Sequence, residues 1–235
     1  MKAVLLIGLM MIGFAGAVPG QISGISRSSA PTWWVSGGVG TFNGQAVYDG
    51  STSSAWDFGN RTSWQYRASL EKAIRNQSSI GIVGTYVHVP FVYRSITTAV
   101  VFTPGAGTGA SCTACDAHLD MESLAATFHA GGGIGFHQVL EVSAGATAYR
   151  NLKRDSDGAA LAPANGNIDG SFLLGYGFGY GLTDHSEVVL VQDYGLVLHE
   201  STNLPTGTSN SNTVRTFRIG MRIGFGSTKP GVRRR

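Results

Sequence analysis

The sequence predicts an all-β protein, an eight-stranded antiparallel transmembrane up-and-down β-barrel. Three observations predict it: apolar and polar residues alternate along many segments, eight such segments follow one another, and long and short connections alternate between them. Successive side chains of a strand point to opposite faces, so a period of two is a strand signal. Transmembrane barrels join an even number of strands by long loops on one side and short turns on the other.

The composition of the 235-residue chain fits one barrel domain. The chain has 34 Gly and only 13% charged residues, and its mean hydropathy is +0.07. Helical membrane spans need about 18 or more consecutive apolar residues. A mean hydropathy this low argues against such spans. The low mean hydropathy agrees with strands that are half apolar and half small or polar, and the abundant glycine disfavours helices.

The first 17 residues have the pattern of a secretory signal peptide. Lys2 provides the positive start, an apolar run covers Ala3 to Phe14, and Ala15 to Ala17 form a small-x-small cleavage site. An N-terminal membrane anchor is the alternative, but the run is too short to span a bilayer. We therefore expect four parts: residues 1–17 as signal peptide, 18–31 as a short lead-in, 32–226 as the barrel and 227–235 as a basic tail.

The positive charge of the chain is concentrated outside the predicted barrel. The formal net charge is +3, but Lys2, Lys229 and Arg233 to Arg235 together contribute five positive charges. The remaining body therefore carries a charge of about −2. Such a body is not a basic surface for nucleic acid, so no nucleic-acid partner is predicted.

The first two strands are predicted at residues 32–42 and 63–74. Trp33 and Trp34 open the first strand, and a polar loop at residues 43–59 separates the two. In the second strand, Trp64, Tyr66, Ala68 and Leu70 alternate with Gln65, Arg67, Ser69 and Glu71. This is the apolar-out, polar-in pattern of a membrane barrel strand.

The third and fourth strands, predicted at residues 80–93 and 118–134, have no clear phase. In the third strand Ile80 and Val87 lie on opposite phases, and a β-bulge near Pro90 would explain the change. The connections expected around these strands are a long loop at residues 94–117 and a tight connection at residues 135–138.

The last four strands are more regular. Residues 139–150 alternate clearly, and along residues 171–182 aromatic and aliphatic residues alternate with glycines. Glu187 and Asp193 share one face of the strand at residues 187–198. The last strand ends near residue 226 with a gapless apolar face made of Phe217, Ile219, Met221, Ile223 and Phe225. Long polar loops are expected at residues 151–170 and 199–212.

The continuous aromatic face favours a membrane barrel over a soluble barrel or sandwich. A soluble barrel would put apolar side chains inside and charges outside. Here the charged residues share the parity of the glycines, opposite the aromatic face, so they are expected to point into the lumen. Two aromatic girdles are then predicted, with Trp33, Trp34 and Phe225 at the inner interface and Trp64, Tyr93 and Phe172 at the outer one.

The lumen is the first candidate functional site. Six charged residues are predicted to point into it: Arg67, Glu71, Glu141, Asp193, Arg218 and Arg222. Glu71 and Arg222 lie on the two strands that flank the first one and are expected to approach each other across it. The network is either a charged pore or a packed polar plug. An eight-stranded barrel is only wide enough for side chains, so the plug is favoured.

Cys112 and Cys115 are expected to form a small disulfide in an outer loop, because an exported chain is in an oxidising environment. A redox motif would need a βαβ context, which this polar loop does not offer. A metal site made of both cysteines and His118 is the minority alternative, because Asp116 is the only evident fourth ligand. No metal or cofactor is therefore predicted.

An enzyme and a binding surface are the other function classes that the sequence raises. His199 and Ser201 form the only His-x-Ser pattern, which lies in a polar loop. Neighbours in such a loop rarely hold a nucleophile and base in reach of each other, so no catalytic residue is predicted. The long loops are natural places for recognition of a surface ligand, because they stand on a rigid barrel.

The last strand carries the sharpest resemblance. Its pattern of polar, Gly, apolar and aromatic residues, made by Arg218, Gly220, Ile223 and Phe225, resembles the C-terminal assembly signal of small Gram-negative outer-membrane β-barrels of the OmpA/OmpX type. The resemblance covers nearly all of the mature chain and differs at the basic tail after Phe225. It implies insertion by the barrel assembly machinery, contact with outer-membrane lipid and lipopolysaccharide, and a structural or surface-interaction role without catalysis.

Overall fold

The computed structural model describes residues 30–59, 61–75, 77–95, 112–163, 166–202 and 204–226. The predicted signal peptide, the basic tail, most of the lead-in and residues 96–111 of the outer loop lie outside these ranges. Ten β-strands make up the described part, and no helix in it is long and apolar enough to cross a membrane.

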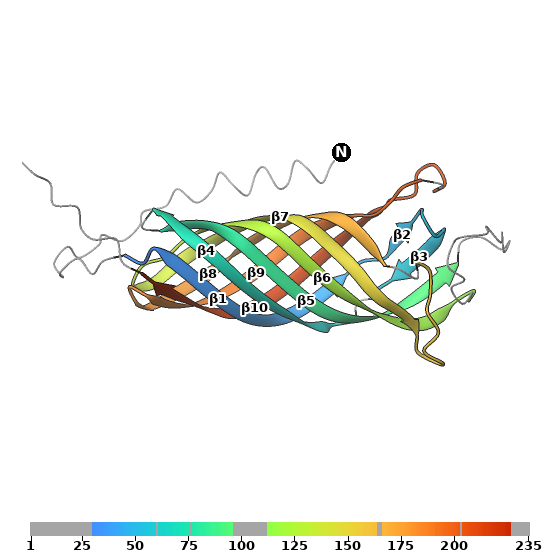
Figure 1. Ribbon diagram of the computed structural model, residues 1–235, viewed down its shortest axis with the longest axis horizontal. Coiled ribbons are helices and arrows are strands. Elements are labelled where there is room, and N and C mark those ends of the chain that lie inside the picture. Colours follow the sequence, from blue (N-terminus) through green and yellow to red (C-terminus); the bar gives the residue numbers. More distant parts are fainter. Residues whose placement is uncertain are drawn as a thin grey trace, which may run out of the picture.

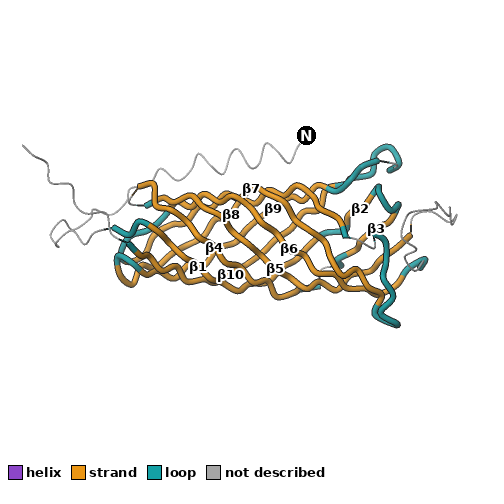
Figure 2. Tube along the Cα trace, viewed as in Figure 1, coloured by secondary structure: helices purple, strands orange, loops and turns teal. Residues whose placement is uncertain are grey.

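Eight of the ten strands form a closed antiparallel barrel, which confirms the predicted fold class (Figures 1 and 2). β1 pairs with both β4 and β10, and β5 pairs with both β4 and β6, so the sheet has no open side along the barrel wall. The barrel strands are β1 (Trp33–Gly44), β4 (Ser63–Arg75), β5 (Ser78–Ser95), β6 (Cys115–Ala130), β7 (Gly135–Arg154), β8 (Asn167–Thr183), β9 (Ser186–Leu198) and β10 (Ser211–Phe225).

The first and last strands close the barrel in a continuous register. Trp33 lies opposite Phe225, and Val39 lies opposite Ile219 on one side and Tyr66 on the other. The short connections lie at the end of the barrel where β1 begins and β10 ends (Figure 1). Closure matters here because a barrel satisfies every backbone group of the wall within the sheet, as lipid requires.

The prediction of a loop at residues 43–59 was wrong. This segment forms a hairpin of β2 (Val47–Asp49) and β3 (Ser54–Asp57), and β3 pairs with the end of β5 that extends beyond the first residue of β4. Val47 and Trp56 of the hairpin face inward and are fully buried, which explains why this segment is ordered although its sequence is mostly polar. Figure 1 shows the hairpin at the end of the barrel opposite the short turns.

The connection between the fourth and fifth barrel strands was also misplaced. β6 ends at Ala130 and β7 begins at Gly135, so the turn covers residues 131–134 and not 135–138. Gly131, Gly132 and Gly133 have φ values of 132°, 148° and 113°, a region that disfavours residues with a Cβ. Three successive glycines therefore fix the turn, and the strand predicted to run to residue 134 ends before them.

β5 contains no bulge near Pro90, contrary to the sequence-based expectation. Its pairing with β6 runs without a register shift from Ser78 opposite Ala130 to Tyr93 opposite Cys115. The buried residues of β5 keep one parity along the strand. The interior that they face changes from polar near the short turns to apolar near the outer loops, so the apolar residues change parity in the sequence. Near the outer loops, a register shift lies instead between β6 and β7, where Asn151 has a φ of 54°.

The outward face of the barrel wall is apolar and exposed. It carries the aromatic and aliphatic side chains that alternate with buried polar ones; examples are Trp64, Tyr66, Leu70, Ile82, Leu124, Phe136, Phe172, Tyr176, Phe178, Tyr180, Leu190, Leu196, Phe217, Ile219, Ile223 and Phe225. The buried residues of the wall include charged side chains of β4, β7, β9 and β10: Glu71, Glu141, Glu187, Asp193, Arg218 and Arg222. Apolar side chains outside and charges inside are the arrangement of a transmembrane barrel.

Ile219 gives a direct test of the lipid-facing wall. Its side chain is 53% exposed, and its partners across the strands are Val39 and Leu190. Ile219→Lys is expected to lower the free energy of unfolding in lipid vesicles by about 2–4 kcal/mol, because the ammonium group would face hydrocarbon. Urea unfolding measures the change. Ile219→Leu is the control, and equal stability of the two variants would contradict a lipid-facing position.

Candidate functional site in the lumen

Arg222 of β10 is the centre of a buried polar cluster at the end of the lumen near the short turns. Its guanidinium bonds Glu71 of β4 at 2.8 Å, Ser79 of β5 at 2.9 Å and Glu187 of β9. His129 of β6 accepts a further hydrogen bond through Nε2 at 2.7 Å. Glu71 and Arg222 therefore contact each other across β1, as expected, and Arg222 has three further partners.

A second cluster lies farther along the lumen, around Glu141 of β7. Its Oε2 accepts hydrogen bonds from Arg67 at 2.7 Å and from Arg218, and its Oε1 lies 3.1 Å from His129 Nδ1. Arg218 Nε also donates to Asp193 of β9 at 3.0 Å. His129 therefore connects the two clusters: its Nε2 accepts from Arg222, which leaves Nδ1 to donate to Glu141.

The strand pattern explains why these charges meet. Each is an inward residue on its strand, and in a narrow barrel the inward side chains of strands far apart in sequence fill the same volume. Among the described residues the two clusters hold the guanidiniums of Arg67, Arg218 and Arg222 and the carboxylates of Glu71, Glu141, Glu187 and Asp193, all buried. Each buried charge has a partner of opposite sign, which offsets much of its desolvation.

Glu187, His129 and Ser79 belong to the clusters but were not among the predicted site residues. Glu187 shares the inward parity of Asp193, so the alternation of β9 carried the signal for it. His129 and Ser79 lie on the two strands whose phase was unclear from the sequence. Their burial follows from the register of β5 and β6 with their neighbours, a long-range property.

The opposite end of the lumen is filled mainly by aromatic and aliphatic side chains, beside the buried pair of Asp169 and His199. Trp56 of β3 is fully buried, and its ring centroid lies 5.2 Å from that of Tyr149 and 5.0 Å from that of His199. Phe91 packs against Trp56 at 6.1 Å and against Phe58 at 5.7 Å. The hairpin of β2 and β3 therefore places an aromatic group inside the barrel end that the outer loops surround.

A cavity of about 30 Å³ lies between the polar clusters and the aromatic group. A water molecule needs about 10–15 Å³ of such space, so the cavity has room for only two or three. Its walls contain polar residues such as Arg67 and Gln65 and apolar residues such as Val87, Met121, Val197 and Val214.

The predicted girdle residues separate into two groups. Trp33, Trp64, Phe172 and Phe225 are exposed on the outward face. Trp34 and Tyr93 do not belong to a girdle. The ring of Trp34 lies on the inward parity of β1, 4.8 Å from the Arg222 guanidinium carbon, and Tyr93 is 5% exposed among the apolar residues of the outer end. Trp33 and Trp34 are neighbours, so a strand cannot present both to lipid.

The residues of the assembly pattern lie on both faces of β10. Arg218 and Gly220 are on its inward parity, whereas Ile223 and Phe225 are exposed on the outward face. The pattern therefore describes one lumen residue, one small residue and two lipid-facing residues of the closing strand.

His199 and Ser201, the predicted His-x-Ser pattern, are not brought together in the structure. His199 is buried with Nδ1 at 2.9 Å from Asp169, whereas Ser201 is exposed. Cys112 and Cys115 are joined in a disulfide, and His118 pairs with Asp155. No group of three or more His, Cys, Asp or Glu that could hold a metal occurs within the described ranges.

The turn between β7 and β8 is held by a charged pair. Arg154 donates two hydrogen bonds to the Asp157 carboxylate, at 2.9 and 2.5 Å, and the Ala159 N–H donates a third at 3.1 Å. The Arg154 hydrogen bond, followed by that of Ala159, lowers the pKa of Asp157 to about 2. The ion pair with Arg154 therefore favours the charged form of the Asp157 carboxylate.

No family model and no curated protein matches the chain. Among solved structures, it is similar to Neisserial surface protein A (10% identity, 84% of this chain and 100% of that chain, TM-score 0.48) and to OprG from Pseudomonas aeruginosa (13%, 85% and 98%, 0.49). It is also similar to Ail of Yersinia pestis, solved in complex with the heparin analogue sucrose octasulfate (10%, 82% and 99%, 0.42). The identities are low, and the barrel assignment rests on the strand pairing described above.

Proposed function

We propose that the protein is an integral outer-membrane barrel with a structural or surface-interaction role and a lumen closed to ions and solutes. The observation that carries this proposal is the Arg222 cluster, which joins β4, β5, β6, β9 and β10 through one guanidinium. The exported pattern of the N-terminus and the aromatic end of the closing strand support insertion by the barrel assembly machinery. Lipid and lipopolysaccharide would then surround the wall.

Closure of the lumen is supported at two levels. Near the short turns, buried polar contacts cross the lumen, such as the hydrogen bond of Arg222 of β10 to His129 of β6 and the ion pair of Arg218 of β10 with Glu141 of β7. Near the outer loops, Trp56 and its aromatic neighbours fill the interior. An ion would have to separate buried pairs and then cross an apolar region, and both steps are costly.

The decisive measurement is single-channel conductance of the purified, refolded protein in a planar lipid bilayer. The expected result is the absence of a steady open level, with folding verified by a β-rich circular dichroism spectrum in the same lipid. A steady level that changes in Glu71→Gln would contradict the proposal and make the lumen a pore. Tyr48→Ala, on the exposed side of the β2–β3 hairpin, is the matched control for nonspecific leakage.

A barrel enzyme that modifies lipid A is the alternative besides a small channel, and recognition of a surface ligand is the surface-interaction role that the proposal includes. The burial of His199 and the exposure of Ser201 disfavour the enzyme, because a base must reach the hydroxyl that it activates. The loops that stand on the barrel end support recognition of a surface ligand, since a rigid scaffold positions loops for recognition.

A further inference from the structure

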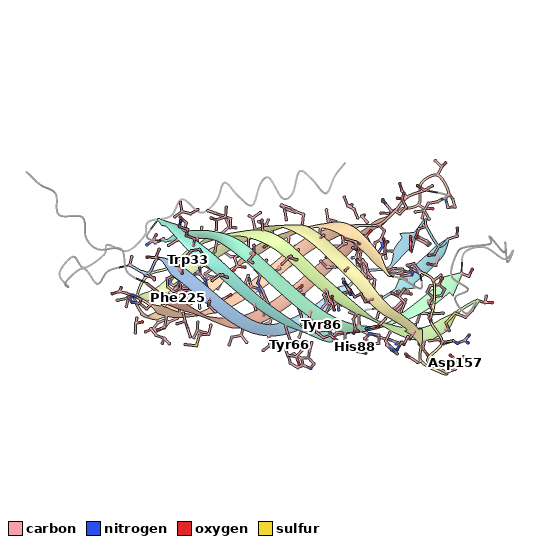
Figure 3. The ribbon with its side chains drawn as sticks, viewed as in Figure 1. Trp33, Tyr66, Tyr86, His88, Asp157 and Phe225 are labelled. Carbon is pink, nitrogen blue, oxygen red and sulfur yellow. A yellow bond between two sulfur atoms is a disulfide. The ribbon has the colours of Figure 1, made fainter. Side chains whose placement is uncertain are left out.

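A band of polar side chains lies on the outward face of β5, β6 and β7, beyond the end of the apolar wall. Tyr86, His88, Asp120 and Asn151 form one hydrogen-bonded group there, and His118 pairs with Asp155 beside it. Figure 3 shows His88 farther toward the loop end of the barrel than Tyr66 and Tyr86. These residues face away from the lumen, so they are independent of whether the lumen conducts.

The two histidines of this band have the same local arrangement. His88 Nδ1 lies 2.8 Å from Asp120 Oδ1, and His118 Nδ1 lies 2.6 Å from Asp155 Oδ1. A carboxylate accepts a hydrogen bond from an imidazole N–H, so each aspartate keeps the proton on Nδ1. In this tautomer the ring lone pair is on Nε2. In the described part of the chain, neither Nε2 has a hydrogen-bond partner.

Asp120 is itself held in place. The Tyr86 hydroxyl donates to its Oδ1 at 3.0 Å, and the Asn151 amide donates to its Oδ2 at 2.6 Å. Asn151 adopts its positive φ at the register shift between β6 and β7, which brings its side chain to Asp120. The orientation of His88 is therefore fixed by three strands. A carboxylate that orients a histidine in this way is the usual outer partner of a metal-binding imidazole.

The two imidazole rings are close enough to share one ion. Their centroids are 5.2 Å apart with an angle of 40° between the planes. Two imidazoles bound to one tetrahedral ion, with Zn–N distances of about 2.0–2.1 Å, have centroids about 5 Å apart. The side chains of His88 and His118 are 57% and 30% exposed, so an ion and its waters can reach them.

We propose that His88 and His118 bind a divalent transition-metal ion, of which Zn²⁺ is the test case, through their Nε2 atoms. Water completes the coordination, and Asp120 and Asp155 act as positioning residues. Imidazole nitrogen suits Zn²⁺, Cu²⁺ and Ni²⁺, whereas Mg²⁺ and Ca²⁺ prefer oxygen ligands. The site therefore discriminates against the Mg²⁺ and Ca²⁺ that oxygen-rich surfaces bind.

Calorimetric titration of the refolded full chain with ZnCl₂ tests the proposal, with no histidine in any purification tag. We expect one ion per chain for the unmodified protein, and millimolar MgCl₂ should not displace it. His88→Gln and His118→Gln should each weaken Zn²⁺ binding more than the loss of an orienting carboxylate does. Asp120→Asn and Asp155→Asn should weaken it about 10- to 100-fold.

His185→Gln is the matched control, because His185 lies in the turn between β8 and β9 at the other end of the barrel. It should bind Zn²⁺ as the unmodified protein does. Circular dichroism and urea unfolding of each variant separate loss of the site from loss of the fold, since all the substituted side chains lie on the outer surface. Zn²⁺ binding that is unchanged in His88→Gln, or no saturable binding to the folded unmodified protein, would overturn the proposal.

Discussion

Arg222→Ala is expected to lower the free energy of unfolding in lipid vesicles by about 3–5 kcal/mol, the cost of removing one partner from a buried ion pair. The substitution leaves Glu71 and Glu187 without their shared cation and removes the hydrogen bond to His129 Nε2. Two carboxylates buried in a narrow lumen then face each other with no guanidinium between them. Urea unfolding followed by tryptophan fluorescence measures the loss.

Arg215→Ala is the control for this prediction, because Arg215 lies on the same strand and faces outward. Its guanidinium carbon lies 5.7 Å from the centroid of the exposed Tyr194 ring, an interaction of about 0.5–1 kcal/mol. Adding Glu71→Gln and Glu187→Gln to Arg222→Ala should recover part of the stability, because the uncompensated charges are removed. Equal effects of Arg222→Ala and Arg215→Ala would mean that the buried cluster does not hold the barrel together.

Trp56→Ala is expected to cost about 3–5 kcal/mol in the local stability of the outer end, the usual range for loss of a fully buried tryptophan. The indole contacts Phe91, Tyr149 and His199, and its Nε1 donates to Ser54 Oγ at 2.8 Å. Without it, the β2–β3 hairpin loses the group that attaches it to the interior. Limited proteolysis should then cleave within residues 43–59 at a protease concentration that spares the unmodified protein.

Tyr48→Ala provides the comparison for Trp56→Ala, because Tyr48 is on the same hairpin and is 40% exposed. It should change neither the cleavage nor the unfolding of the barrel by more than about 0.5 kcal/mol. Cleavage of both variants at the same rate would show that the hairpin is not anchored through the tryptophan.

The period of two determined the class of fold and most of the inward charges. On β4, β7, β9 and β10 the charged residues in question lie opposite an apolar parity, so Arg67, Glu71, Glu141, Asp193, Arg218 and Arg222 could be placed inside before any register was known. The alternation of long and short connections gave the strand count and the antiparallel order. These features are local in sequence, because side-chain direction in a strand depends only on parity.

The tertiary structure decided what the local pattern left open. Which charges meet, such as Arg222 with Glu187, depends on the register around the closed barrel, and so does the approach of the Trp34 ring to Arg222. The hairpin at residues 43–59 is ordered only because the barrel end offers its aromatic residues an apolar interior. The neighbouring His88 and His118 come from strands that pair across a long loop. Contacts of this kind join distant parts of the chain, so a pattern within one strand contains no information about them.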